Sequence, residues 1–239
     1  MIIIQSHSNS PGFNLSTEEY LFSGRQDEIL FLYVNEPCVV IGRNQDLFCE
    51  VNTPFCLENN IPVFRRISGG GSVFQDTGNL NYCFISNRVQ GNSSLNADFL
   101  RPIVTVLNDL QVEVQTGKRK DLWLPGGHKI SGTASHVGKS RELHHGTLLY
   151  DSNLDTLEKS LSPKVIKQES RKIASVHSPV ENIRTYLKAK KYNAPETDLF
   201  LKLFTEELLS LYSLDSVSEL STEELSGIIP LLPVLNSSN

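Results

Sequence analysis

Residues 63–85 of the chain read VFRRISGGGSVFQDTGNLNYCFI. The stretch sets two strand-like runs, residues 61–66 and 81–86, on either side of three consecutive glycines at 69–71. Because glycine has no β-carbon, a ligand can lie directly on the main-chain N–H groups, and the two arginines before the glycines offer guanidinium groups to phosphate or carboxylate oxygens. The stretch therefore indicates an anion-binding loop. Three glycines alone also fit a plain hairpin with an exposed basic flank.

Short strands with hairpin-length connections surround this loop. The predicted strands are residues 2–6, 29–34, 38–42, 61–66, 81–86, 111–115, 121–124, 128–137 and 142–150. The predicted helices are residues 14–23, 53–59, 96–110, 154–161, 198–212 and a last turn at 222–225, followed by a loose tail at 226–239. We expect Asn14 to cap the first helix after a break at Pro11-Gly12, and residues 35–37 to join the second and third strands as a pair. The pattern predicts an α/β (α+β) fold with mixed or antiparallel sheets packed by helices, and not a doubly wound parallel sheet.

The composition is that of one soluble globular domain. A length of 239 residues fits a single domain spanning residues 1–239 and is short for two. Hydrophobic residues make up 39%, and no run approaches the ~18 apolar residues of a membrane span, so we expect no membrane segment. The first residues lack the basic region of a signal peptide, which predicts a cytoplasmic location. The four cysteines form no CxxC pair and are predicted to be free thiols in a reducing compartment.

The distribution of charge limits the partners. A net charge of −5 argues against a general nucleic-acid-binding protein, which would be basic. Lys and Arg nevertheless dominate residues 160–195, whereas acids dominate residues 196–239. A solvated face is one interpretation of the basic run. A docking patch for an acidic protein partner is the other, because such a patch speeds encounter.

Residues 65–81 follow the pattern R-R-x-S-G-G-G-x-V-x-x-D-x-G-N-x-N. Four further stretches accompany this pattern: FNLSTEEYLF at 13–22, VVIGRNQ at 39–45, HKISGTA at 128–134 and HHGTLL at 144–149. These ordered blocks resemble the lipoate–protein ligase A family. The resemblance implies the α/β catalytic fold that this family shares with biotin ligases, octanoyltransferases and class II aminoacyl-tRNA synthetases. Two places depart from the family pattern: Gln75-Asp76 stands where His-Asp is usual, and His177 and Pro179 stand where arginines are common.

The resemblance assigns the central chemical role to one lysine. Joining a carboxylic acid to an amine requires an activated acyl group, such as an acyl-adenylate. Forming the adenylate brings the carboxylate close to the α-phosphate of ATP, so fixed positive charge and main-chain donors must offset the repulsion. The resemblance implies that Lys129, in a K-x-S-G-x-A block, is catalytic and bridges the carbonyl and phosphate oxygens of the adenylate. A lysine on a strand otherwise usually faces solvent.

The resemblance also implies which residues bind the substrates. Arg66 and Ser68 would hold phosphate or carboxylate oxygens, and Asp121 would hold Mg²⁺ against the phosphates of ATP. The other candidates for binding lipoate or its adenylate are Gly69, Gly70, Gly71, Gln75, Asp76, Asn79, Ser131, Gly132, His145 and Gly146. Asp76 could instead cap the glycine loop. His145 could be a core histidine, since only one of two successive histidines on a strand can face a site. The candidates for an apolar slot around the lipoyl tail are Val39, Val40, Val73 and Phe74.

Three functions fit these expectations. The first is a lipoate–protein ligase that uses ATP, Mg²⁺ and lipoic acid to modify a lysine of a lipoyl-domain protein, such as a 2-oxoacid dehydrogenase acyltransferase subunit or the glycine cleavage H protein. The second is a transferase that moves a lipoyl or octanoyl group from a preformed donor without ATP, which in related octanoyltransferases proceeds through a cysteine thioester. The third is an inactive homologue that binds lipoyl domains. The small C-terminal accessory domain of two-domain relatives is expected to be absent, so that a separate accessory protein is a further expected partner.

Overall fold

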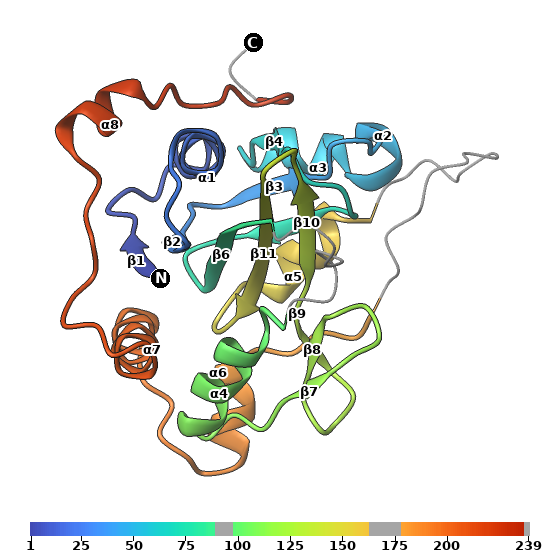
Figure 1. The fold of residues 1–239 in the computed structure, drawn as a ribbon. Coiled ribbons are helices and arrows are strands. Elements are labelled where there is room, and N and C mark those ends of the chain that lie inside the picture. Colours follow the sequence, from blue (N-terminus) through green and yellow to red (C-terminus); the bar gives the residue numbers. More distant parts are fainter. Residues whose placement is uncertain (89–97, 163–177, 237–239) are drawn as a thin grey trace.

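A five-stranded sheet forms the centre of the molecule. The computed structural model describes residues 1–88, 98–162 and 178–236. The strands of the large sheet lie in the order β1 (Ile2–Gln5), β2 (Ile29–Val34), β6 (Asn79–Asn87), β11 (Arg141–Leu149) and β10 (Thr133–Val137) (Figure 1). Only β1 and β2 run parallel, and the other neighbours are antiparallel. The prediction of mixed sheets packed by helices is confirmed.

Two three-stranded sheets lie beside the large one. The first has the order β4 (Val63–Arg65), β3 (Cys38–Ile41), β5 (Val73–Gln75). The second has the order β7 (Gln115–Thr116), β8 (Leu122–Trp123), β9 (Lys129–Ser131). The glycine loop connects β4 to β5, and β9 carries the predicted catalytic lysine, so each small sheet contributes one part of the predicted site.

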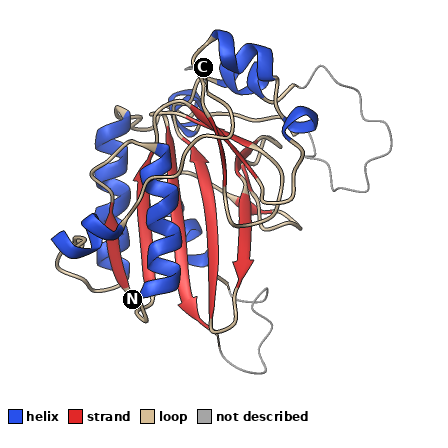
Figure 2. Ribbon diagram, turned by 90° about the horizontal axis from the view of Figure 1, so that it is seen from above, coloured by secondary structure: helices blue, strands red, loops and turns tan. Residues whose placement is uncertain are grey.

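Helices cover both faces of the large sheet, as Figure 2 shows from above. Helix α1 (Pro11–Gly24) packs on one face, and α4 (Arg101–Asp109), α6 (Ile183–Ala189) and α7 (Thr197–Leu211) pack on the other. Helices α2 (Leu47–Glu50), α3 (Thr53–Glu58) and α5 (Leu154–Ser160) pack instead on the sheet of β4, β3 and β5, and α8 (Thr222–Gly227) buries no residue. Alternation along β2 decides the packing: Leu30 and Leu32 face the cluster with α4, α6 and α7, whereas Ile29 and Phe31 face α1. No helix within the described ranges has both the length and the hydropathy needed to cross a bilayer.

The first helix begins earlier than predicted. Ser10 is its N-cap, accepting a hydrogen bond from the Phe13 N–H, and Pro11 and Gly12, predicted as a break before the helix, belong to its first turn. A proline suits this position because the first helical N–H groups have no intrahelical partner. Asn14 is therefore not a cap. It is a residue of the helix itself, and it is fully buried.

The second and third predicted strands exist but do not pair with each other. β2 pairs with β1 and β6, and β3 pairs with β4 and β5. Both strands are apolar runs with nearly every residue buried, so each forms the interior of its own sheet. Hydrophobicity does not identify the partner of such a strand, and the hairpin expected at residues 35–37 is wrong.

Several other boundaries differ from the prediction. The strand predicted at 128–137 divides at Gly132 into β9 and β10, which belong to different sheets. Of the strand predicted at 111–115, Gln111 lies in a turn at φ 65°, residues 112–114 have no regular secondary structure, and only Gln115 joins β7. The helix predicted from residue 96 begins at Arg101, and residues 96 and 97 lie outside the described ranges. Strand β5 and helices α2 and α6 were not predicted.

The C-terminal tail is not loose along its described length. The Leu231 N–H donates to Gly12 O, and the Val63 N–H donates to Leu235 O at 2.9 Å. These main-chain bonds extend the small sheet at β4 as far as Leu235. Half of the lysines and arginines in the basic run at 160–195 fall at 163–177, outside the described residues, so the predicted docking patch stays a prediction.

Candidate active site

The glycine loop is held in place by Arg66. This side chain is only 7% exposed. Its Nε donates to Ser68 Oγ at 2.8 Å, and its Nη1 donates to Val40 O at 3.0 Å. Its Nη2 donates to Gly69 O at 2.7 Å and to Gly71 O at 2.8 Å. Because a guanidinium has five N–H groups, these four bonds leave one for the predicted contact with a ligand. Arg66 therefore acts first as an internal support for the loop.

Arg65 and the neighbouring loop complete this framework. Nη1 of Arg65 donates to the main-chain oxygens of Gly42, Arg43 and Gln45 at 2.8–3.1 Å. The side chain of Gln45 in turn donates to Gly70 O at 3.1 Å. The two neighbouring arginines thus support different loops. Arg66 holds the glycine loop, and Arg65 holds the loop that follows β3.

We expect Gly70→Ala and Gly69→Ala to separate folding from ligand approach. Gly70 has φ 85°, and an added β-carbon would lie 3.0 Å from Arg66 Nη2, so this variant should lose about 1–3 kcal/mol of unfolding free energy. A β-carbon at Gly69 would meet no protein atom within 4 Å. Gly69→Ala should therefore keep the wild-type melting temperature. Its affinity for lipoate should fall if the ligand lies on the loop and should stay unchanged otherwise. Thermal unfolding and calorimetric binding of lipoate measure the two effects, and equal melting-temperature losses in both variants would contradict this account.

A cavity of about 270 Å³ lies between the glycine loop and the predicted catalytic lysine. Nine predicted site residues line it: Arg66, Gly70, Gly71, Gln75, Asp121, Lys129, Gly132, His145 and Gly146. Lys129 Nζ lies 3.7 Å from Asp121 Oδ2. Burial lowers the pKa of Lys129, the Asp121 carboxylate opposes that shift, and the neighbouring Arg119 charge adds to it. The lysine ammonium is thus partly desolvated, which strengthens its interaction with an anion.

A second cavity of about 460 Å³ adjoins the first. The two share Ser72, Val73, Lys129, Gly132 and Thr147. Much of the second lining is apolar, from Phe74, Leu149, Leu154, Leu157, Leu161, Pro179 and Val180. The main chain of Lys129 is fixed beside this cavity, since its N–H donates to Pro179 O at 2.8 Å and its carbonyl accepts from the Glu181 N–H. Lys129 therefore lies where the two cavities meet.

Of the four predicted slot residues, three line a cavity. Val40 lines the first cavity, Val73 lines both, and Phe74 lines the second. Val39 lies instead in the core between the small sheet and its helices.

Five predicted site residues do not line the first cavity. Ser68 is fully buried in the glycine loop, Gly69 is a half-buried residue of the same loop, and Ser131 lines the second cavity. The Asp76 carboxylate accepts from the Gly78 N–H at 3.0 Å and the Asn153 N–H at 2.8 Å, so it caps the turn before β6 and not the glycine loop. Asn79 is fully buried and donates to Asn81.

Gln75 belongs to a buried chain of amide side chains at one end of the first cavity. Asn14 donates to Asn35 Oδ1 at 2.8 Å, Asn35 donates to Gln75 Oε1 at 2.7 Å, and Gln75 donates to Asn81 Oδ1 at 2.7 Å. Each bond fixes the orientation of the next amide, because an amide has a distinct donor and acceptor end. Gln75 thus ties α1 to β6 while lining the cavity.

The two histidines of β11 face opposite sides of the sheet, as predicted. His144 stacks on Phe99 with ring centroids 4.3 Å apart, away from the cavity. His145 lines the cavity. Gly146 follows it directly opposite Tyr82 on β6, and a β-carbon there would overlap the Tyr82 ring. Gly146 is therefore required by cross-strand packing.

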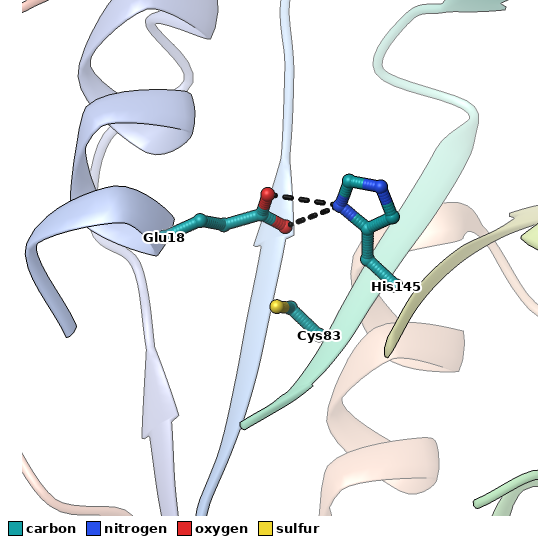
Figure 3. Close-up of side chains that lie close together, drawn as sticks. All are labelled: Glu18, Cys83 and His145. Atoms are coloured by element: carbon teal, nitrogen blue, oxygen red, sulfur yellow. Dashed lines mark hydrogen bonds and ion pairs between the residues drawn. The ribbon is translucent and has the colours of Figure 1, made fainter. Parts of the chain in front are cut away.

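Glu18 of α1 lies beside His145. The Nδ1 atom of His145 is 2.9 Å from Glu18 Oε2, and Cys83 on β6 completes a buried group of three (Figure 3). The ligand atoms of the three residues lie within 4.8 Å of one another, close enough to hold a metal ion. Glu18 was not among the predicted site residues, although it falls within the FNLSTEEYLF block. Tyr33, Asn81 and Arg119, which also line the first cavity, were missed as well.

Comparisons with known proteins identify the family. A model of the lipoyl protein ligase A/B catalytic domain matches residues 10–208. The lipoate-protein ligase LplJ of Bacillus subtilis is 40% identical over 193 residues, covering 80% of this chain and 58% of that protein. Lipoate–protein ligase 1 of Staphylococcus aureus is 36% identical over 229 residues, covering 94% of this chain and 69% of that protein. The chain therefore belongs to the lipoyl protein ligase A/B catalytic domain family, and it spans about three fifths to two thirds of the length of these relatives.

Solved structures share the fold. The P. falciparum protein LipL1 in complex with lipoate superposes with a TM-score of 0.72 at 27% identity, covering 91% of this chain and 65% of that one. A bi-partite lipoate protein ligase from Thermoplasma acidophilum, studied with its E2 lipoyl domain, gives 0.74 at 22% identity and covers 94% and 88%. A lipoate-protein ligase A bound with ATP gives 0.74 at 21% identity and covers 94% and 90%. The family resemblance drawn from residues 65–81 and the predicted fold are confirmed.

Proposed function

We propose that the chain carries the catalytic unit of a lipoate–protein ligase, within residues 1–239. It activates lipoate with ATP to lipoyl-adenylate and transfers the lipoyl group to a lysine of a lipoyl-domain protein. The observation that carries the proposal is the position of Lys129 between two adjoining cavities, one beside the glycine loop and one largely apolar. Relatives named as lipoate-protein ligases, and solved relatives holding lipoate or ATP, support these substrates.

In the first half-reaction a carboxylate oxygen of lipoate attacks the α-phosphorus of ATP, and the bond to pyrophosphate breaks. Lys129 offsets the repulsion between the two anions with its ammonium, and the glycine loop offers main-chain N–H donors. Arg66 keeps this loop in one conformation through its bonds to Gly69 O and Gly71 O. Such preorganised donors stabilise developing charge without reorganising during the reaction.

In the second half-reaction the amine of the acceptor lysine attacks the acyl carbon. An amide bond forms, the bond from the acyl carbon to the AMP oxygen breaks, and the amine loses a proton. Lys129 stabilises the charge that develops on the carbonyl oxygen and on the departing phosphate. One ammonium therefore serves both half-reactions, because the same acyl–phosphate junction is made and then broken.

Asp121 is suited to hold Mg²⁺. Its carboxylate is 4% exposed, lines the first cavity and offers hard oxygen ligands. Magnesium is usually held by one or two carboxylates together with substrate phosphates, so a single protein carboxylate fits. When bound, the ion would neutralise charge on the phosphates of ATP. Asp121 also contacts Lys129, so it orients the lysine as well.

The transferase alternative receives little support from the cysteines. Cys38, Cys56 and Cys83 are buried, and burial raises the pKa of each thiol, which disfavours the nucleophilic thiolate. All four cysteines are free thiols, as predicted, which fits a reducing cytoplasm. The hypothesis of an inactive homologue rested on Gln75. This side chain has two buried amide partners, and it lines the same cavity as Arg66, Asp121 and Lys129.

The proposal is tested by lipoylation of an isolated lipoyl domain, followed by mass spectrometry. One reaction contains lipoate, ATP and Mg²⁺, and the other contains synthetic lipoyl-adenylate. We expect the lipoyl group on the acceptor lysine in both reactions. Transfer from lipoyl-adenylate alone would assign adenylate formation to a separate accessory protein. Absence of transfer from both donors would refute the ligase, and transfer only from an acyl thioester without ATP would support the transferase.

We propose lipoyl domains as the partners, with 2-oxoacid dehydrogenase acyltransferase subunits and the glycine cleavage H protein as acceptors. The support is a solved relative that was studied with its E2 lipoyl domain. That relative is a bi-partite ligase, which motivates including a separately encoded accessory protein in the lipoylation assay.

A further inference from the structure

A continuous chain of buried hydrogen bonds runs from the glycine loop to helix α1. Arg66 Nε lies 2.8 Å from Ser68 Oγ, and Ser68 Oγ lies 2.6 Å from His145 Nε2. His145 Nδ1 lies 2.9 Å from Glu18 Oε2, and the Tyr33 hydroxyl donates to Glu18 Oε1 at 3.0 Å. The four members from Arg66 to Glu18 are between 0% and 8% exposed. Each bond is therefore shielded from water.

With a neutral imidazole at His145, the two ends of the chain determine the direction of every bond. An arginine can only donate hydrogen bonds, and an ionised carboxylate can only accept them. Glu18 therefore requires a hydrogen on His145 Nδ1. A neutral imidazole then has a bare Nε2, which accepts from the Ser68 hydroxyl, while Ser68 Oγ accepts from Arg66. His145 is thus held as the Nδ1–H tautomer.

Two other interpretations of these residues fit less well. A Ser-His-Glu order suggests a nucleophilic serine, but Ser68 is fully buried and does not line either cavity. A metal site formed by Glu18, Cys83 and His145 would place a dication near the buried Arg66. Burial lowers the pKa of Arg66 to about 10, and the negative charge of Glu18 opposes that shift. Glu18 is therefore already needed as the anion for this guanidinium.

Resting on the proposed function, we infer that Glu18 is a positioning residue of the active site. It contacts neither reacting group. It fixes the tautomer of His145, and through Ser68 and Arg66 it fixes the glycine loop, since the same guanidinium binds Gly69 O and Gly71 O. The loop conformation that faces the cavity therefore depends on a carboxylate of helix α1.

The first test requires neither a variant nor an activity assay. Nitrogen-15 NMR of the histidine rings in the wild-type protein should show His145 with Nδ1 protonated and Nε2 unprotonated. A wild-type His145 protonated on Nε2 alone would overturn the inference. Because the spectrum is recorded without substrate, this result stands even if the protein proved not to be a ligase.

The second test removes the charge of Glu18 and keeps its shape. In Glu18→Gln the amide can donate as well as accept, so we expect a mixture of His145 tautomers. We expect kcat/KM to fall at least about tenfold with lipoate and ATP and also with lipoyl-adenylate, which is the lower end of what a buried hydrogen bond to a charged group contributes. Glu19→Gln is the matched control on the same helix. We expect this variant to keep the wild-type tautomer of His145 and a kcat/KM within about twofold of wild type.

A double-mutant cycle of Glu18→Gln with Ser68→Ala distinguishes a specific effect on the hydrogen-bond chain from a general loss of folding. Ser68→Ala interrupts the chain in the middle, so the double variant should be no worse than the poorer single variant. Fully additive losses would overturn the inference, as would a Glu18→Gln protein with a lower melting temperature but wild-type kcat/KM and tautomer. Zinc in the purified protein, whose removal lowers activity, would overturn it in favour of a metal site.

Discussion

Lys129→Ala is expected to abolish acyl transfer while leaving the fold intact. The ammonium lies in a partly desolvated site where the two cavities meet, and losing one such group typically costs ~3 kcal/mol or more of transition-state stabilisation, a factor of about 10² or more. Both half-reactions should be affected, because in the proposed mechanism the lysine contacts the junction that is made in one and broken in the other. Lipoylation from lipoate with ATP and from lipoyl-adenylate measures the two losses separately.

The control for this variant is Lys118→Ala. Lys118 is an exposed lysine of the turn between β7 and β8 and does not line the first cavity. It should transfer at a rate close to wild type. If Lys129→Ala kept transfer within about tenfold of wild type, with an unchanged circular dichroism spectrum, the assignment of Lys129 as the catalytic residue would be wrong.

Gly42→Ala is expected to displace the glycine loop and to destabilise the fold. The new β-carbon would overlap Gly70 O, which is a main-chain atom and cannot rotate away. The glycine loop would have to move from β3, and overpacking of this kind costs about 1–3 kcal/mol of unfolding free energy. For a chain of this length each 1 kcal/mol lowers the melting temperature by about 2–4 °C. Because the displaced loop lines the first cavity, transfer activity should fall as well.

The matched control is Gly24→Ala at the end of α1. Its added β-carbon would meet only Tyr20 Cε1 at 4.0 Å, an ordinary contact. We expect a melting temperature within about 2 °C of wild type for this variant. Differential scanning calorimetry compares the two proteins, and a Gly42→Ala variant as stable and as active as Gly24→Ala would show that the glycine loop yields more easily than its contacts suggest.

The sequence of this chain predicts where strands form better than it predicts which strands pair with each other. The runs that became β2 and β3 were recognised because both are apolar and bounded by polar turns. Their assignment to different sheets was not recognised, because a strand buried on both faces carries no pattern that names its neighbour. In the same way Gly132 divides one predicted strand into two that serve separate sheets.

The residues behind the site were harder to predict than those that line it. Lys129 and the glycine loop lie in ordered motifs, so their place in one cavity could be expected before the fold was known. Glu18 could not, because a buried carboxylate on the inner face of a helix has the same sequence appearance as a solvated one. Its burial becomes visible only when β6 and β11 bring Cys83 and His145 beneath α1. Arg66 was predicted as a ligand contact, and its bonds to the loop follow from a conformation that the sequence does not specify.

The main-chain bonds of Lys129 couple the lysine to the second cavity. The segment that binds its N–H and carbonyl, at Pro179 and Glu181, includes two residues that line this cavity beside the lysine, Pro179 and Val180. A molecule that fills the cavity stabilises this segment and so raises the free energy required for local opening around the Lys129 amide. By linkage, restraint of the lysine backbone favours occupancy of the cavity to the same extent. An apolar chain bound there would thus slow amide hydrogen exchange at Lys129 without touching its ammonium group.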